Sequence, residues 1–197
     1  LANALARSIR CSFSRIQCTP DLLPADVTGT SIYRQDSHSF EFRQGPIFAN
    51  VVLADEINRT TPRTQSAMLE AMSDGTVSAE GGVFPLPQPF MVVATQNPYE
   101  FEGTYFLPEN QLDRFLMQID VLYPDRAAER RILLETTSGD QAQPKAAMSA
   151  HDLVAIQQLV RRLPVGERIV ESILDVVRMA RPGEGDAAIT KHVVWGP

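Results

Sequence analysis

Two adjacent carboxylates, Asp55 and Glu56, directly follow the apolar run Val51-Val52-Leu53-Ala54. A buried strand that ends in acid can place an Asp to hold Mg²⁺ through water and a neighbouring Glu to polarise an attacking water molecule. Such a pair suits the hydrolysis of a nucleotide phosphate, because catalysis of phosphoryl transfer depends on positioning and charge stabilisation. The other interpretation is a strand that simply ends in solvated acids, since short motifs of this kind have many false positives.

A second polar group follows a second apolar run. Residues 90–94 are typical of a buried strand, and Thr95-Gln96-Asn97-Pro98 comes directly after them. In open sheets of parallel strands, ligands bind outside the carboxyl ends of the strands. If the two strands are neighbours, Asn97 therefore lies near Glu56. The alternative is a turn nucleated by Asn97 and Pro98.

Arg114 is a candidate for contact with a neighbouring subunit. It lies in a predicted helix whose apolar residues Leu112, Phe115 and Leu116 leave the arginine at an edge. An arginine supplied in trans can stabilise the charge on a γ-phosphate and raise the rate of hydrolysis by several orders of magnitude. The alternative is a surface arginine paired with Asp113 or Glu109.

Hydrophobic periodicity predicts the elements that precede these residues. Residues 1–9 carry apolar side chains at every fourth position, as in a helix, and residues 13–18 alternate like a half-exposed strand. Residues 19–29, with two prolines and a glycine, are expected to form a loop. Residues 31–44 alternate weakly and are expected to form a strand or an extended loop.

Strand and helix patterns alternate around the polar groups. Residues 47–54 are an uncharged run of strand length, as expected for a strand covered by helices on both faces. Residues 61–75 predict a helix with a threonine cap, a first-turn proline and a glycine stop. Residues 77–86 predict a hairpin around two glycines.

The rest of the chain is predominantly helical in pattern. Helices are predicted to begin at Pro108 and Pro124, the second ending by Gly139, with a short strand near residues 119–121 between them. Two amphipathic helices follow, the first behind a capping box at residues 149–152. We therefore predict an α/β fold with a parallel sheet flanked by helices, followed by a small all-α domain.

The predicted domain limits follow from the same patterns. The α/β domain takes residues 1–138, a polar segment with Gly and Pro at residues 139–148 is the linker, and the helical domain takes residues 149–197. The chain begins inside a helical pattern, without a methionine, and ends without a closing helix. Both ends are therefore expected to be cut.

Composition limits the classes of function. The 197 residues are 44% hydrophobic and 21% charged, which is typical of a globular chain and not of a disordered or fibrous one. The net charge of -6 disfavours a dedicated nucleic-acid surface. We expect a cytoplasmic protein, because no apolar run reaches the length of a membrane span and no signal peptide is recognised.

Cysteine and histidine patterns give little support to a metal centre. Cys11 and Cys18 match no common zinc spacing and are interpreted as core thiols. The three histidines, at positions 38, 151 and 192, are scattered and form no His-x-x-x-His pair. A metallohydrolase that uses Asp55, Glu56 and histidines is therefore the least favoured class.

Jointly, the motifs closely resemble the MoxR branch of the AAA+ ATPases in order and spacing. The matching segments are Val51-Val52-Leu53-Ala54-Asp55-Glu56-Ile57-Asn58-Arg59, Ala94-Thr95-Gln96-Asn97-Pro98, Gly103-Thr104-Tyr105 and Leu112-Asp113-Arg114-Phe115. Residues 15–17 and 21–29 also look like the early strand and loop of that family. The resemblance is strong over residues 1–138 and loose over the helical remainder.

This resemblance implies an AAA+ P-loop NTPase fold that binds and hydrolyses ATP with Mg²⁺. Asp55 and Glu56 would form the Walker B motif, with Asp55 holding Mg²⁺ through water and both residues facing the nucleotide. Asn97 would be sensor 1, which also contacts the nucleotide, and Arg114 the arginine finger. The hairpin at Gly81-Gly82 looks like the insertion before sensor 1, and the C-terminal helices look like the AAA+ lid.

Partners and processes are also implied by the family alone. MoxR-type proteins act as chaperone-like ATPases. The resemblance of this chain to that family implies assembly into a ring, as a hexamer, and remodelling or maturation of client protein complexes. Proteins with a von Willebrand factor A domain are the partners that the family suggests. A membrane span and a nucleic-acid partner are not expected.

The sequence departs from the family pattern at three places. The phosphate-binding loop Gly-x-x-x-x-Gly-Lys-Thr is absent, and so is the sensor 2 arginine expected near Gly196-Pro197. Phe106 stands where the family has a proline. Since the loop's backbone N–H groups and lysine cradle the β- and γ-phosphates, we expect these 197 residues alone to turn over ATP negligibly.

Two rival functions share the same motifs. A helicase-like AAA+ ATPase that acts on nucleic acid would also have a strand ending in Asp-Glu and an Arg-Phe pair, although the net acidity disfavours it. A non-catalytic AAA+ scaffold would assemble without hydrolysis. The presence of Asp55, Glu56, Asn97 and Arg114 together argues against such a degenerate site.

Overall fold

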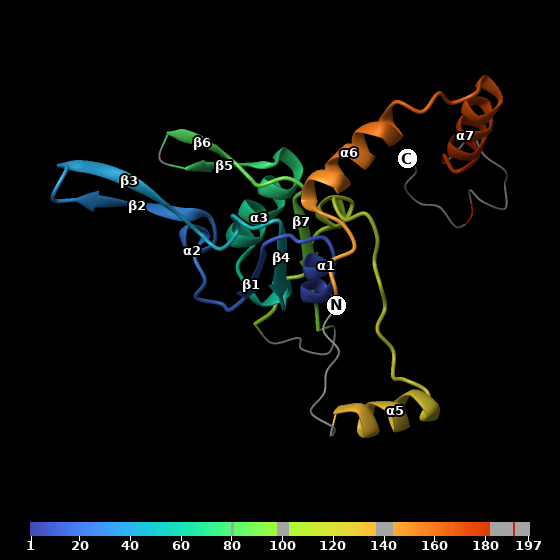
Figure 1. Ribbon diagram of the computed structural model, residues 1–197, viewed down its shortest axis with the longest axis horizontal. Coiled ribbons are helices and arrows are strands. Elements are labelled where there is room, and N and C mark those ends of the chain that lie inside the picture. Colours follow the sequence, from blue (N-terminus) through green and yellow to red (C-terminus); the bar gives the residue numbers. More distant parts are fainter. Residues whose placement is uncertain (80, 98–102, 137–143, 182–190, 192–197) are drawn as a thin grey trace. The chain divides into compact units, whose positions relative to one another are not determined.

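The computed structural model describes residues 1–79, 81–97, 103–136, 144–181 and 191 (Figure 1). Its contacts divide the chain into two compact units, Leu1–Val154 and Ala155–Pro197. Part of the predicted linker, residues 139–143, lies outside the described residues. The predicted limits of 1–138, 139–148 and 149–197 therefore stay a prediction.

The first unit is built on a parallel sheet of three strands in the order β1-β4-β7. The strands are β1 (Phe13–Gln17), β4 (Val51–Asp55) and β7 (Met91–Ala94). Parallel neighbours need crossover connections, and the helix α3 (Pro62–Asp74) lies in the chain between β4 and β7. The two predicted apolar strands are therefore neighbours, which is the condition under which Asn97 was expected to lie near Glu56.

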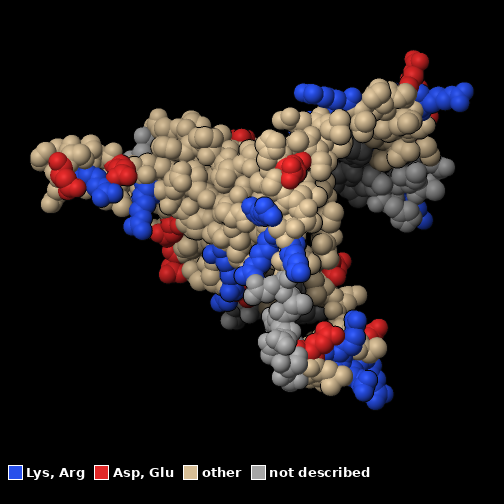
Figure 2. Space-filling model, in the orientation of Figure 1, with Lys and Arg blue, Asp and Glu red and all other residues tan. Residues whose placement is uncertain are grey.

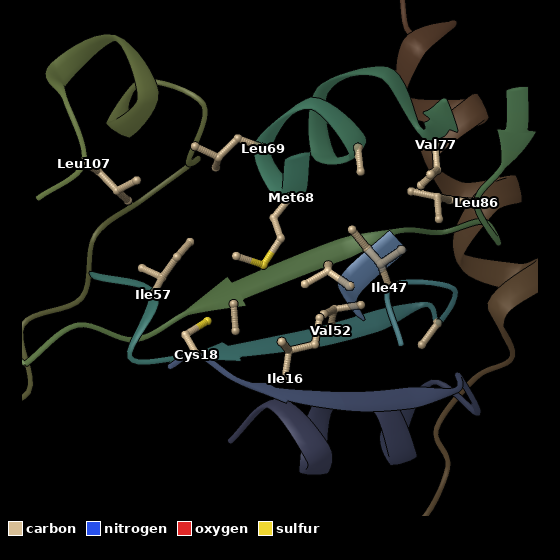
Figure 3. Close-up of a cluster of buried hydrophobic side chains, with 14 residues drawn as sticks. Ile16, Cys18, Ile47, Val52, Ile57, Met68, Leu69, Val77, Leu86 and Leu107 are labelled. Atoms are coloured by element: carbon tan, nitrogen blue, oxygen red, sulfur yellow. The ribbon is translucent and has the colours of Figure 1, made fainter. Parts of the chain in front are cut away.

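The two faces of the sheet bury alternate residues of each strand, as the period of two requires. Val52 and Ala54 of β4 belong to the larger apolar cluster beneath α3, whereas Val51 packs with the short helix α1 (Ala2–Ser8) on the opposite face. Figure 3 shows Met68 extending from α3 toward the sheet, with Val52 facing it. Helices therefore cover both faces, which confirms the predicted α/β class.

The predicted helix over residues 61–75 is confirmed in detail. Thr61 accepts a hydrogen bond from the backbone N–H of Thr64, Pro62 occupies the first turn, and Gly75 ends the helix in a left-handed conformation with φ of 65°. That conformation favours glycine because it lacks a Cβ. Both ends of α3 are thus determined by local sequence.

Asn50 connects the starting edges of all three strands. Its Oδ1 accepts hydrogen bonds from the backbone N–H and the hydroxyl of Ser12, at 3.1 and 2.8 Å, and its Nδ2 donates to the carbonyl of Pro89 at 2.9 Å. Ser12 precedes β1 and Pro89 precedes β7. One side chain therefore helps to fix the register of the three strands, and this register brings their carboxyl ends side by side at the other edge of the sheet.

Two antiparallel hairpins lie outside the central sheet. They are β2–β3 (Gly29–Arg34 and Ser39–Gln44) and β5–β6 (Thr76–Ala79 and Gly82–Pro85). Phe42 stacks on Phe84 with ring centroids 4.1 Å apart, and Figure 1 shows the two hairpins side by side. The hairpin predicted around residues 81 and 82 is confirmed. Residues 31–44, which were expected to form a strand or an extended loop, belong to the β2–β3 hairpin.

Several predicted elements were wrong in extent or type. The predicted loop at residues 19–29 contains the helix α2 (Pro24–Thr28), which forms because Pro24 fits a first turn and Asp26 accepts the N–H of Leu23 at 2.9 Å. The predicted strand at residues 47–54 starts only at Val51. Ile47 is buried but lies in the preceding turn, where its N–H donates to the Val27 carbonyl.

The segment after residue 108 holds less regular structure than predicted. The helix α4 (Glu109–Leu112) is one turn long, and residues 119–121 form no strand. Ile119 and Val121 are 67% and 91% exposed, so no neighbouring strand or helix buries them here. A strand needs a paired neighbour, and this segment has none among the described residues.

The regular elements after residue 125 in the described part of the chain are helices, as predicted. The helices are α5 (Arg126–Thr136), α6 (Ala150–Arg161) and α7 (Glu167–Met179). The predicted capping box before α6 is confirmed, since Ser149 and Asp152 exchange hydrogen bonds between side chain and backbone. No helix in the described part of the chain is long and apolar enough to span a membrane.

Candidate functional site

Polar side chains form a row across the carboxyl edge of the central sheet. Gln17 of β1 is the register partner of Asp55 at the end of β4, and Thr95 follows β7 one position after the paired Ala54 and Ala94. In a parallel sheet, register partners project to the same face. The row Gln17, Asp55 and Thr95 therefore lies at the edge where open α/β sheets bind ligands.

Both carboxylate oxygens of Asp55 have partners. The Thr95 hydroxyl donates to Oδ1 at 2.6 Å, and Arg15 of β1 donates to Oδ2 from Nε at 3.1 Å and from Nη2. The hydrogen bond from Thr95, followed by that from Arg15, lowers the pKa of Asp55 below its ordinary value. Asp55 is therefore an oriented, ionised carboxylate at neutral pH.

Glu56 continues the edge in an unusual backbone conformation. Its φ of 56° and ψ of 51° lie in the left-handed region, which a non-glycine residue rarely occupies and which costs about 1 kcal/mol or more. Its N–H donates to the Thr95 hydroxyl at 2.9 Å. Its carboxylate accepts from Arg59 at 3.0 Å and from Gln17 at 3.3 Å. Such strain in a partly exposed acid is typical of functional sites.

A buried glutamine supports the segment that follows Glu56. The Nε2 of Gln65 in α3 lies 3.1 Å from the Ile57 carbonyl, 3.3 Å from that of Thr60 and 2.9 Å from that of Tyr105. Gln65 is 1% exposed. One amide therefore joins the short helix Ile57–Arg59 to the loop before α4.

Asn97 lies beside this same segment. The side chain of Asn58 donates to the backbone carbonyl of Asn97 at 3.3 Å, and the carbonyl of Thr95 accepts the N–H of Ile57 at 2.9 Å. Asn97 is thus placed next to the residues that follow Glu56, where neighbouring strands were expected to bring it. Pro98 lies outside the described residues.

Arg114 is placed elsewhere in the unit. Its Nη1 donates to the carbonyl of Leu69 at 3.1 Å and to the hydroxyl of Ser73 at 2.8 Å, both in the C-terminal half of α3. A cation is favoured there because the helix dipole is negative at that end. The structure therefore brings Asp55, Glu56 and Asn97 together and leaves Arg114 at a separate position on α3.

Cys18 lies in the core behind the carboxylates. Burial, together with the negative charges of Asp55 and Glu56, raises the pKa of its thiol to about 11. Cys18 is therefore an inert core thiol, and Cys11 is partly buried. His38 contacts Tyr33 in the β2–β3 hairpin, His151 is exposed in α6 and His192 lies outside the described residues.

The donor set indicates which kind of metal complex could bind. Among the described residues, no group of three or more His, Cys, Asp or Glu side chains is arranged to hold a metal ion. Mg²⁺, however, is commonly held by one or two carboxylates together with waters and substrate phosphates. Asp55 and Glu56 fit a magnesium–nucleotide complex of that type.

Sequence reasoning named Asp55, Glu56 and Asn97 as candidate site residues and did not name the residues that contact them. Arg15, Gln17, Thr95 and Gln65 were not identified as site residues. A signal existed for Gln65, which lies three and four residues before Met68 and Leu69 and so interrupts the apolar stripe of α3 with a polar side chain. Arg15 and Gln17 carry no such signal, because half-exposed strands normally alternate polar residues.

Comparisons with known proteins agree with this architecture. Residues 1–117 match the family model of the ATPase family associated with various cellular activities (AAA). The chain is 48% identical over 182 residues to the uncharacterised protein YeaC of Bacillus subtilis, covering 92% of this chain and 57% of that protein. It is 46% identical over 179 residues to the chaperone MoxR1 of Mycobacterium tuberculosis, covering 91% of this chain and 47% of MoxR1.

A solved structure shares the fold as well as the sequence. The crystal structure of a proposed ATPase from Cytophaga hutchinsonii superposes with a TM-score of 0.80 at 40% identity, covering 91% of this chain and 55% of that one. The chain spans about half the length of the curated relatives it matches. From its sequence, sheet order and carboxylate edge, the chain belongs to the ATPase family associated with various cellular activities (AAA), in its MoxR-type branch.

Proposed function

We propose that this chain carries the Walker B and sensor 1 part of an ATP-hydrolysing site in a MoxR-like, chaperone-type AAA+ ATPase. The observation that supports this most is the pair Asp55 and Glu56 at the carboxyl edge of the sheet, each held by hydrogen bonds from neighbouring elements. A solvated strand end would need no such partners. The proposed action is the remodelling or maturation of client protein complexes, a role consistent with the name of the relative MoxR1.

The proposed roles follow from charge and position. Asp55 holds Mg²⁺ through water, since its oriented carboxylate remains ionised at neutral pH. Glu56 polarises the attacking water, and Arg59 and Gln17 keep its carboxylate at the edge of the sheet. Asn97 acts as sensor 1 beside them. Mg²⁺, when bound, supplies charge neutralisation for the phosphate oxygens.

Assembly belongs to the same proposal. Arg114 is the proposed arginine finger, acting on the nucleotide of a neighbouring subunit in a ring, with a hexamer as the proposed size. Its attachment to Leu69 and Ser73, away from Asp55 and Glu56 of its own chain, is compatible with a role in trans. Proteins with a von Willebrand factor A domain are the proposed partners, and the cytoplasm the proposed location.

Surface charge bears on the helicase-like alternative. A nucleic-acid binder usually presents clustered Lys and Arg on one face. On the face drawn in Figure 2, basic and acidic side chains occur close together, both over the β2–β3 hairpin and over α5. Over these two elements the mixture gives no specific support to nucleic acid, and the net charge of -6 also disfavours it, so the protein-remodelling role is retained.

The proposal is tested by ATP hydrolysis in the product of the complete reading frame that contains these residues. Glu56→Gln should keep ATP binding and lower the turnover by roughly 10²-fold or more, because the carboxylate that polarises water is lost. Glu70→Gln makes the same substitution at an exposed position of α3 and should leave the rate unchanged. An unaltered rate in Glu56→Gln would remove Glu56 from the mechanism.

A second comparison tests the expectation about the chain alone. The 197 residues lack the loop Gly-x-x-x-x-Gly-Lys-Thr, so they should hydrolyse ATP negligibly on their own. Robust hydrolysis by these residues alone would show that the phosphates are held by groups other than that loop.

A further inference from the structure

One hydroxyl group contacts both of the proposed Walker B residues. The Oγ1 of Thr95 accepts the backbone N–H of Glu56 at 2.9 Å and donates its own proton to Oδ1 of Asp55 at 2.6 Å. A hydroxyl has one proton and two lone pairs, so it can serve as donor and acceptor at once. The direction of each bond is settled, because an N–H can only donate and an ionised carboxylate can only accept.

Other side chains in the described part of the chain also donate to the two acids. Arg15 donates to the Asp55 carboxylate, and Arg59 and Gln17 donate to that of Glu56. The Thr95 hydroxyl instead contacts the carboxylate of the first residue and the backbone of the second. The same hydroxyl therefore restrains both the orientation of the Asp55 carboxylate and the left-handed backbone conformation of Glu56.

The position of Thr95 makes this contact rigid. Thr95 directly follows β7, whose residues Met91 to Ala94 are paired with Val51 to Ala54 of β4. The N–H of Thr95 continues this ladder by donating to the Ala54 carbonyl at 3.0 Å. A β-branched side chain also has few χ1 rotamers. The hydroxyl is therefore held by the sheet itself.

We propose that Thr95 is a positioning residue for ATP hydrolysis, whose hydroxyl fixes the Asp55 carboxylate and the Glu56 backbone in one arrangement. This inference rests on the proposed function. Thr95 acts through these two acids and does not need to touch the nucleotide. An error of about 1 Å in the placement of reacting groups can lower a rate by roughly 10²-fold.

Two substitutions remove opposite parts of the side chain. Thr95→Val keeps the shape and loses the hydroxyl, whereas Thr95→Ser keeps the hydroxyl and loses the methyl group. In the product of the complete reading frame, Thr95→Val should lower kcat for ATP roughly 10²-fold with KM changed less than about threefold. Thr95→Ser should keep kcat within about threefold of the unsubstituted protein.

A second readout uses the protein without nucleotide. The Thr95 hydroxyl accepts the backbone N–H of Glu56 at 2.9 Å. Hydrogen exchange of the Glu56 amide should therefore be faster in Thr95→Val and little changed in Thr95→Ser. A residue that only filled space would not give this pattern.

The outcomes separate this inference from the proposed function. If the unsubstituted protein shows no magnesium-dependent hydrolysis, the proposed function fails and the inference with it. If that protein is active and Thr95→Val retains more than about a third of its kcat, the inference alone fails. Equal losses in Thr95→Val and Thr95→Ser, or unfolding of Thr95→Val by circular dichroism, would also overturn it, because Thr95 would then act through packing or stability.

Discussion

Replacing Gln65 by Met should destabilise the unit that carries the carboxylates, although the two side chains have similar size. The Nε2 of Gln65 lies 2.9 to 3.3 Å from three carbonyls, but an amide has only two N–H protons, so two full hydrogen bonds are the upper count. Each buried carbonyl left without its partner costs about 1 to 3 kcal/mol. Two such losses amount to about 2 to 6 kcal/mol. The Thr60 N–H still donates to the Ile57 carbonyl, so we expect Gln65→Met to lower the free energy of opening by an amount in the lower part of this range, about 2 to 4 kcal/mol.

Native-state hydrogen exchange measures this quantity in the intact protein. Peptides that cover β4 and α3 report the free energy of opening of this unit whatever other domains are present. Glu70→Met places the same new side chain on the exposed face of α3 and should change that free energy by less than about 0.5 kcal/mol. A change below about 1 kcal/mol in Gln65→Met would refute the role of these hydrogen bonds.

Two further predictions concern charge. The folded-state pKa of Asp55 is below its unfolded value of about 3.9, so its ionised form stabilises the fold above about pH 4, and this contribution is lost as the pH falls through the folded value. Arg15→Gln should raise the Asp55 pKa, measured by NMR titration, and an unchanged pKa would exclude the Arg15 contact in solution. For Arg114, hydrolysis should be lost in rings of Arg114→Ala alone and in rings of Glu56→Gln alone. In rings assembled from equal amounts of the two variants, it should return to about a quarter of the normal rate, because about one interface in four then combines intact Glu56 with intact Arg114. Full activity of Arg114→Ala alone would exclude the arginine finger.

Local patterns were sufficient for the elements whose causes are local. The helix α3 has its cap at Thr61, its proline at Pro62 and its stop at Gly75, and all three were readable in the sequence. Ile119 and Val121 show the opposite case. Their apolar character predicts a strand, but pairing depends on a neighbour that the residues themselves do not specify, and both side chains are exposed.

The candidate site also has a part that the sequence predicts and a part that it does not. The strand Val51 to Ala54 and the acids Asp55 and Glu56 can be recognised from the sequence, because the apolar run and the acids that end it are consecutive residues. Arg59, which donates to Glu56, is three positions away, but Arg15, Gln17 and Thr95 contact the acids from 39 or 40 positions away in the chain. Their distance along the chain hides them from any local pattern.

By itself, the sequence determined the fold class, the family and the two carboxylates at a strand end. Only the tertiary structure decided that Arg15, Gln17 and Thr95 hold these acids, because the contacts depend on the parallel register of β1, β4 and β7. It also decided that Arg114 rests on α3, away from the acids of its own chain. The register is set by packing and by the hydrogen bonds of Asn50 to Ser12 and Pro89. These residues are far apart in the sequence, so the register exists only in the folded chain.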